Sequence, residues 1–255
     1  IADGLKGTEY RDIPINMKHC KTAKIGSAIA DADIVISLNH FKGHEQAGFG
    51  GALKNLGMGS ASRGGKMEMH SSSKPVINQD QCVSCGVCVK NCAHNAMEMN
   101  SEGKASILYD KCTGCGQCVA LCMFGAAQPV WNESADILNE KIAEYAYAVV
   151  NGKPHFHVNF IMDISPNCDC WGMNDAPIVP SIGIAASFDP VALDVASADM
   201  VNAAHALPDT ALTDNSYTEG QDKFSCVHSV TNWRSCVEYA GKIGLGTTKY
   251  TIAKV

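Results

Sequence analysis

Apolar and polar residues follow different patterns in three parts of the chain. In the first part, we expect a helix over Ala23–Ala32, followed by a strand in the run ADIVISLNH at 32–40. This run is a short apolar stretch of the kind found in buried parallel strands. Its large apolar residues are Ile34, Val35, Ile36 and Leu38. Glycine-rich sequence follows the expected strand, up to Lys66.

The last part of the chain alternates between helical and strand patterns. The run at 134–152 predicts an amphipathic helix, with Ser134 as its N-cap and Gly152 near its end. We expect strands at 157–165 and 181–187, and a helix at 189–204 with Pro190 in its first turn. Alternating elements of this kind predict an α/β fold, with helices packed on an open, mostly parallel sheet.

The middle part differs in composition and is internally duplicated. Residues 75–130 hold eight of the thirteen cysteines, in the two similar halves CVSCGVCVKNCAHNAM and CTGCGQCVALCMFGAA. We therefore predict a small inserted ferredoxin-like α+β domain at 75–130, between a first α/β part at 1–74 and a second at 131–255. Because the chain starts at Ile1 and reads there as mid-domain, we expect upstream sequence to be missing.

The spacing of the eight cysteines predicts iron–sulfur clusters. Each half has the pattern C-x2-C-x2-C-x3-C, and the glycines at 86, 114 and 116 ease the tight turns. In two-cluster ferredoxins, the fourth cysteine of each run ligates the other cluster. We therefore predict two [4Fe–4S] clusters. The first has Cys82, Cys85, Cys88 and Cys122 as ligands, and the second has Cys112, Cys115, Cys118 and Cys92.

Zinc is the alternative metal for such cysteines. Structural zinc sites take four ligands from two pairs, which two runs of four cysteines fit poorly. The β-like segments PVINQD and ASILYD precede the two runs, as in bacterial-type ferredoxins. That family usually has proline after the fourth cysteine, whereas Ala93 and Met123 stand here, a departure that concerns the local turn and not the ligation.

Composition and charge narrow the classes of function. Many cysteines without a secretory signal favour metal ligation in a reducing compartment, so we expect a cytoplasmic protein. No apolar run is long enough to span a membrane. The net charge of −6 divides into +3 for residues 1–74, −1 for 75–130 and −8 for 131–255. An acidic chain without a basic run argues against nucleic-acid binding, and we expect neither nucleic acid nor membrane as a partner.

Several segments, in order, resemble a known family. They are HFKGHEQAGFGGALKNLGMG at 40–59, MHSSSKP at 69–75 and CDCWGMNDAPIVPSIGIAASFDPVALDVAS at 168–197. With the position of the insertion, they resemble the uncharacterised iron–sulfur protein family called domain of unknown function 362, in its ferredoxin-containing form. The resemblance reaches to about Asn202. It implies the fold, the clusters and a further upstream α/β segment, but no activity.

Polar residues gather where the first strand is expected to end. His40, Lys42 and His44 lie where this strand ends, at the edge where open α/β sheets bind ligands, and His70 lies just before the insert. Each of these alone is more often a packed or surface residue. Together they are candidates for proton transfer or metal binding.

The glycine-rich segment offers a candidate anion site. Gly50 and Gly51 precede ALKNL, which predicts the start of a helix with exposed amides, and Lys54 lies nearby. The alternative is that these glycines serve close packing or tight turns.

Cys168 and Cys170 lie one residue apart in the polar loop NCDCWGMND, after the strand at 157–165. In an extended loop, residues i and i+2 point to one side. If the two strands run parallel, that side is the edge where the run 32–40 also ends. We hypothesise a third metal site, for zinc or iron, with His40, His44 or His70 completing the two thiolates and Lys42 favouring ionised sulfur. The alternatives are a metal-free reactive pair and two structural thiols.

Three functions follow from these features. The favoured one is a two-cluster electron carrier that relays low-potential electrons to or from a redox protein partner bound by the α/β body. The second is an oxidoreductase whose clusters feed a site in the α/β domain, with Lys42, His44, Cys168 and Cys170 as catalytic candidates. The third is a protein in which clusters only brace the fold. The substrate, the physiological partner and the oligomeric state stay open.

Overall fold

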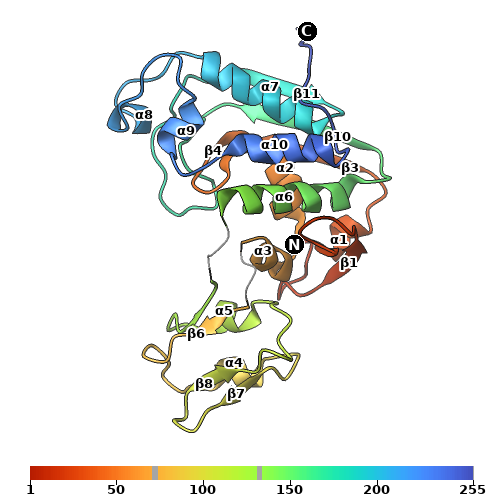
Figure 1. The fold of residues 1–255 in the computed structure, drawn as a ribbon, viewed down its shortest axis with the longest axis vertical. Helices are drawn as coiled ribbons and strands as arrows, with labels where there is room; N and C mark the ends of the chain where they lie inside the picture. The colour runs from red at the N-terminus through yellow and green to blue at the C-terminus, as the bar shows by residue number, and fades with distance from the viewer. Residues whose placement is uncertain (71–73, 131–133, 255) are drawn as a thin grey trace.

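The computed structural model describes residues 1–70, 74–130 and 134–254 (Figure 1). Figure 1 shows two lobes, which we call the body (residues 1–70 and 134–254) and the cysteine lobe (residues 74–130). The apolar cores of these two parts are separate clusters of residues. The predicted domain boundaries near 74 and 130 adjoin residues 71–73 and 131–133, which lie outside the described residues. Residues 71–73 are the three serines of the segment MHSSSKP.

The body is a mixed α/β structure built on a three-stranded sheet. Its order is β11 (Gly183–Ser187), β10 (His155–Ile161) and β3 (Val35–His40). β10 runs parallel to β3, with Phe160 opposite His40, but antiparallel to β11. The expected mostly parallel sheet is therefore replaced by one parallel and one antiparallel pair. The reason is that 162–182 contains no crossover helix, so the chain turns back beside the end of β10, with Gly183 opposite Ile161.

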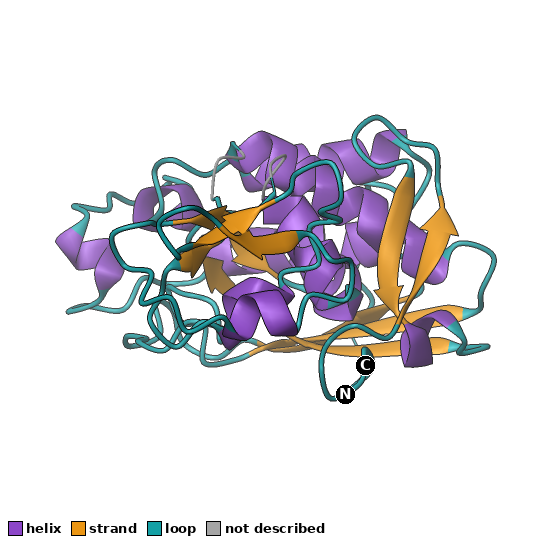
Figure 2. Cartoon of the chain, turned by 90° about the horizontal axis from the view of Figure 1, so that it is seen from below, coloured by secondary structure: helices purple, strands orange, loops and turns teal. Residues whose placement is uncertain are grey.

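Helices cover one face of this sheet (Figure 2). The long helix α7 (Pro190–Ala203) packs directly on β10 and β11, while α6 (Ala135–Val150) and α10 (Trp233–Lys242) pack against each other in a further layer. The opposite face is open, since Ile36, Leu38 and Ile184 are 66%, 65% and 63% exposed. The prediction that the run 32–40 is a fully buried strand is therefore wrong for the described residues: Val35 packs toward the core, while Ile34, Ile36 and Leu38 point to the other side of the pleat.

Two helices begin where the sequence predicts. The Ser134 side chain accepts a hydrogen bond from the Ile137 amide at the start of α6. Asp189 accepts hydrogen bonds from the Val191 and Ala192 amides at the start of α7, where Pro190 occupies the first turn. These side chains bind amides that have no partner within the helix, which is why the helices start there.

The predicted helix over Ala23–Ala32 is wrong. β2 (Thr22–Gly26) pairs antiparallel with β1 (Tyr10–Pro14), and only α1 (Ser27–Ala30) is helical. Burial in β2 alternates, with Ala23 and Ile25 facing the core, so the period of two outweighs the helix propensity of the alanines.

The segment after β3 carries the elements that shape one site. β4 (Lys42–His44) and β5 (Gly48–Gly50) form a hairpin. α2 (Ala52–Lys54) follows and continues as the π-helical turn η1 (Asn55–Gly59), and α3 (Arg63–His70) leads toward the cysteine lobe. The C-terminal part adds α8 (Ala211–Asp214) and α9 (Lys223–Val227) to the body.

The cysteine lobe repeats one arrangement twice. β6 (Val76–Ile77) pairs with β9 (Ala127–Gln128), and β7 (Met97–Met99) pairs with β8 (Ala105–Ile107). One short helix follows the second cysteine of each run. It is α4 (Val87–Lys90) in the first run and α5 (Gln117–Leu121) in the second. Among all the described helices of the chain, none has both the length and the apolar character needed to cross a bilayer.

Candidate metal and thiol centres

Four cysteines of the lobe line one cavity. The cavity is lined by Cys92, Cys112, Cys115 and Cys118, together with Pro75, His94 and Met97 among others. They are the four residues assigned to the second cluster from spacing alone. Cys92 comes from the first run and the other three from the second, so the two halves of the lobe share this cavity.

The remaining four cysteines are Cys82, Cys85, Cys88 and Cys122. Burial raises the pKa of Cys88, and the neighbouring Cys82 and Cys85 add to the rise, as expected for thiols that face one another. Cys82, Cys88 and Cys122 belong to the small apolar core of the lobe. The structure thus gathers Cys82, Cys85 and Cys88. Cys122 packs against the same core, as do three cysteines of the other set, so this core does not separate the two sets.

The backbone near the cysteines makes tight turns at glycines and donates hydrogen bonds to two of the sulfurs. Gly86, Gly114 and Gly116 have φ of 69°, 71° and 71°, a left-handed conformation that favours glycine. Backbone amides also donate to sulfur: Ala96 to Cys92 at 3.3 Å and Ala127 to Cys122 at 3.4 Å, four and five residues after the fourth cysteine of each run. Hydrogen bonds to ligating sulfurs are one way in which a protein tunes a cluster.

Helix α3 of the body contacts the segment that carries Cys115. Arg63 Nη1 donates to Gln117 Oε1 across 2.7 Å. At Gly64, a Cβ would lie 3.4 Å from the Cys115 Cα atom. The cavity of the second cysteine set therefore lies on the side of the lobe that faces the body.

A second group of thiols lies in the body, at one edge of the sheet. β3 and β10 run parallel, so the hairpin that follows β3 and the loop that follows β10 meet there. The Gly43 amide donates to the Ser165 carbonyl across 2.8 Å. A Cβ on Gly43 would lie 2.0 Å from the Pro166 carbonyl oxygen, so only glycine allows β4 this close to the loop.

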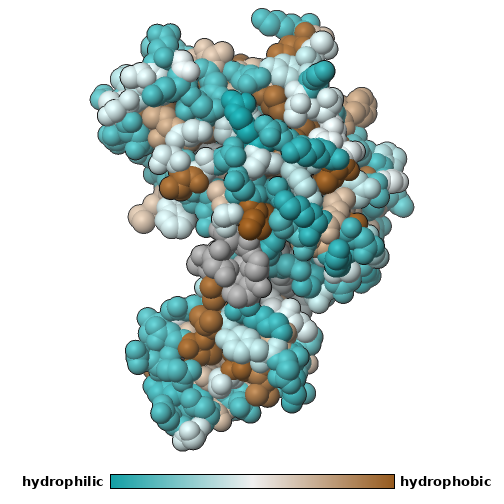
Figure 3. All heavy atoms as spheres, in the orientation of Figure 1, coloured by the Kyte–Doolittle hydropathy of each residue, from teal (hydrophilic) through white to brown (hydrophobic). Residues whose placement is uncertain are grey.

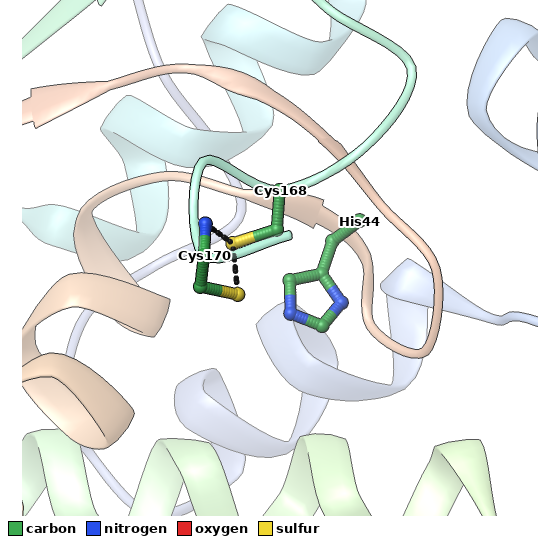
Figure 4. Close-up of side chains that lie close together, drawn as sticks. All are labelled: His44, Cys168 and Cys170. Atoms are coloured by element: carbon green, nitrogen blue, oxygen red, sulfur yellow. Dashed lines mark hydrogen bonds between the residues drawn. The ribbon is translucent and has the colours of Figure 1, made fainter. Parts of the chain in front are cut away.

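His44, Cys168 and Cys170 converge at this edge (Figure 4). One ligand atom from each lies within 4.8 Å of the other two, so this group could hold a metal ion. Of the five residues predicted for a third site, the described structure brings these three together. His40 is engaged elsewhere, through Nδ1 with Asp169 at 2.9 Å and through Nε2 with the Met162 carbonyl at 2.8 Å. His70, at the end of α3, is not among the three converging ligands.

The lysine on the sulfurs is Lys54, not Lys42. Lys54 Nζ lies 3.0 Å from Cys168 Sγ and 4.0 Å from Cys170 Sγ. Lys42 Nζ instead contacts Asp169 at 3.1 Å and the His40 carbonyl at 3.0 Å. The prediction that Lys42 favours ionised sulfur is therefore corrected, because Lys42 holds the carboxylate between the two cysteines.

The two thiols have opposite tendencies to ionise. Burial opposes ionisation of Cys168, but hydrogen bonds from Cys170 and Lys54 outweigh it and lower its pKa. Burial, followed by the hydrogen bond to Cys168, raises the pKa of Cys170 to about 11. Cys170 Sγ donates to Cys168 Sγ across 2.8 Å, so Cys168, beside Lys54 Nζ, is the sulfur of the pair that loses its proton first.

The His44 ring is held in one orientation. Its Nδ1 accepts hydrogen bonds from the Gln46 and Ala47 amides, both at 3.1 Å. Burial, with the positive charge of Lys54 next in size, lowers the pKa of His44 to about 2. The ring is therefore neutral, and because Nδ1 is an acceptor its hydrogen is on Nε2, the nitrogen that faces the sulfurs (Figure 4).

The glycine-rich helix start binds an anion that belongs to the protein. The Ala52 and Leu53 amides donate to the buried carboxylate of Asp194 across 2.8 and 2.9 Å. A Cβ on Gly51 would lie 2.3 Å from Asp194 Oδ1, so glycine admits that carboxylate. The sequence predicts that Gly50, Gly51 and Lys54 bind an external anion. Instead, the Asp194 carboxylate accepts from the amides of Ala52 and Leu53, and Lys54 contacts Cys168.

Sequence reasoning missed Asp169, Asp194 and Glu45 as parts of this edge. The Asp169 carboxylate contacts the His40 ring and forms an ion pair with Lys42. Glu45 Oε2 accepts a hydrogen bond from the Cys168 amide across 3.4 Å. Asp169 lies between the two cysteines in the sequence, which is a signal that was available. Asp194 had none, because it lies inside an apolar helical run.

The fold and these centres define a mixed α/β protein whose cysteines and histidine are arranged so that they could bind metal. Residues 1–199 match the family described as "Domain of unknown function (DUF362)", and the chain therefore belongs to this family. A search among curated proteins found no match to the chain.

Proposed function

We propose that this protein is an iron–sulfur electron-transfer protein with two [4Fe–4S] clusters, held by a ferredoxin-type domain inserted at 75–130 of the α/β chain. Cys82, Cys85, Cys88 and Cys122 hold the first cluster. Cys92, Cys112, Cys115 and Cys118 hold the second. Each cluster, when bound, takes up or releases one electron.

The observation that carries the proposal is the cavity in the cysteine lobe. Four thiols from both halves of the lobe surround it, in the set that the two-cluster pattern assigns. The donors are all sulfur, the ligand type that Fe–S clusters use. The left-handed glycines within the runs and the amides that donate to sulfur fit the same group.

The body then selects the redox protein partner, and the lobe presents the surface for transfer. Apolar side chains interrupt the polar surface of the lobe, shown in brown in Figure 3. Met123 and Phe124, which directly follow Cys122, are among the exposed ones. Residues 75–130 have a net charge of −1, and the clusters add negative charge, so the lobe favours a partner of positive charge. The transfer rate to that partner should then fall as salt rises, and a rate indifferent to salt would remove this steering role.

Iron analysis and spectroscopy test the proposal. An anaerobic preparation should contain about eight irons per chain, and dithionite should bleach its visible absorbance and produce the electron-paramagnetic signal of reduced [4Fe–4S] clusters. About four irons, or zinc in place of iron, would contradict the two-cluster assignment. The composition also leads us to propose a cytoplasmic location, which cell fractionation tests.

A second candidate function is that of an oxidoreductase with its reaction site in the body. The observation that favours it is the Lys54 ammonium on the Cys168 and Cys170 thiols. If a substrate reacts there, its addition to dithionite-reduced protein should reoxidise the clusters without any protein partner. An electron carrier alone would stay reduced under those conditions.

A further inference from the structure

Cys168 and Cys170 differ in access while their sulfurs touch. Cys168 is 2% exposed, whereas Cys170 is exposed. Three donors are directed at Cys168 Sγ: Lys54 Nζ at 3.0 Å, the Cys170 thiol at 2.8 Å and the Cys170 amide at 3.4 Å. A sulfur that receives three donors is stabilised as a thiolate. The neighbouring thiol can therefore give its proton to that thiolate when it reacts.

The surroundings of the pair favour reactive thiols over a metal ion. A metal would need the His44 nitrogen that faces the sulfurs, but that nitrogen carries hydrogen because Gln46 and Ala47 occupy the other one. Lys54 already supplies the positive charge that a metal would bring.

We propose that Cys168 and Cys170 form a redox-active dithiol that reduces a disulfide substrate. In the first step, Cys170 Sγ attacks one sulfur of the substrate as its proton passes to Cys168 Sγ. A Cys170–substrate disulfide forms, the substrate S–S bond breaks, and one substrate sulfur leaves as a thiolate. In the second step, Cys168 gives that proton to solvent water and attacks Cys170 Sγ. The Cys170–substrate bond breaks, and the other substrate sulfur leaves as a thiolate. The substrate gains two electrons, and the pair becomes a disulfide.

The local backbone suits this closure. The Trp171 amide donates to the Cys168 carbonyl across 2.9 Å, so residues 168–171 form a tight turn and not the extended loop expected from the sequence. A turn brings the α-carbons of residues i and i+2 closer than an extended chain does, toward the separations that disulfides need. The short ring stays strained, which makes the disulfide easy to reduce again.

The surface beside Cys170 fits an approaching disulfide. Trp171 and Met173 are 53% and 75% exposed directly after Cys170, and they give an apolar, polarisable platform next to the reacting sulfur. Return of the disulfide to a thiol and a thiolate takes two electrons and one proton. Under the proposed function, the two clusters together supply that number of electrons, although the exchange itself needs only the dithiol.

The chain offers a clean readout of this site. Cleavage after Lys141 and Lys223 releases the tryptic peptide 142–223, whose only cysteines are Cys168 and Cys170. We expect the anaerobic full-length protein, treated with one equivalent of the aromatic disulfide dithiobis-nitrobenzoate, to release both reagent thiolates. The peptide should then lack two hydrogen atoms. Cys168→Ser should instead retain one reagent group on Cys170. Insulin, used as a protein disulfide in a parallel arm, decides whether the site takes protein or only small-molecule disulfides.

Further variants separate this role from a structural one. Lys54→Met should slow the reaction about tenfold, because the thiolate loses a charged hydrogen-bond partner. The matched control Lys249→Met, which replaces an exposed lysine of the C-terminal segment, should leave it unchanged. Cys170→Ser, at the exposed position, should fold and fail to react. Iron content should be equal in all these proteins, so failure at this site is distinguishable from loss of the proposed clusters.

Two outcomes would overturn the proposal. One is that peptide 142–223 keeps both thiols after the folded wild-type protein has met either disulfide. The other is that the wild-type protein binds zinc or iron beyond its clusters and loses that metal in Cys170→Ser, which would assign the pair to a metal site.

Discussion

The cysteine lobe and the edge of the sheet both gather thiols, but they do so in different ways. In the lobe, the four residues around the cavity lie between positions 92 and 118, on turns that glycines make possible. At the sheet edge, Lys54 and Cys168 are 114 positions apart, and packing of β4 against a loop brings them together. Local geometry makes the first centre, and tertiary packing makes the second. A change that disturbs one should therefore leave the other intact.

The largest expected effect is on the lobe. Cys115→Ser removes one thiolate from the cavity, and we expect iron to fall from about eight to about four per chain, because a cluster that loses a thiolate ligand is held poorly. Iron analysis of the anaerobic protein measures this. Cys226→Ser is the control, since Cys226 lies in the body outside both runs, and it should keep all the iron. Equal iron in wild type and Cys115→Ser would remove Cys115 from the ligand set.

The next effect is on the sheet edge alone. In Gly43→Ala, the new methyl group would meet the Pro166 carbonyl oxygen at 2.0 Å, so β4 and the loop must separate. We expect the free energy of unfolding of the body to fall by about 3 kcal/mol, the upper end for overpacking. Alkylation of Cys168 should also become faster while the iron content stays the same. Denaturant unfolding and mass spectrometry of peptide 142–223 measure the two effects.

Gly172→Ala is the matched control for that substitution. Nothing lies within 4 Å of a Cβ at Gly172, in the same loop. Its free energy of unfolding should stay within about 0.5 kcal/mol of wild type. If both alanine variants behave alike, close approach of β4 does not hold the sheet edge together.

The smallest expected effect concerns Glu140 on α6, whose carboxylate binds the side chains of Lys18 and His19. Burial opposes ionisation of Glu140, but hydrogen bonds from Lys18 and His19 outweigh it and hold its pKa below the ordinary 4.5. A depressed pKa stabilises the folded state above pH 4.5, and that stabilisation is lost as pH falls through the lowered value. We expect Glu140→Gln to cost about 1 kcal/mol at pH 7 and nothing at low pH. Urea unfolding across that pH range measures the difference, and a cost that does not change with pH would contradict it.

Much of the local structure was predictable from the sequence. The amphipathic pattern and the cap Ser134 predict α6, and Pro190 in the first turn predicts the start of α7, because these signals act within a few residues. The two-cluster ferredoxin pattern also groups the four cysteines that line the cavity, because in it the fourth cysteine of one run joins the first three of the other. The prediction of a helix at Ala23–Ala32 failed because pairing with β1, a longer-range interaction, decided that segment.

By itself, the sequence determined the eight-cysteine pattern, the caps of the main helices and the strands that meet at the sheet edge, since each depends on neighbours along the chain. The tertiary structure decided the partners of the remaining polar groups. It placed Asp194 on the amides of Ala52 and Leu53, Lys54 on Cys168, and Lys42 on Asp169. A buried charge takes whichever opposite charge or donor the packing brings within reach, and that choice is made only when distant segments meet.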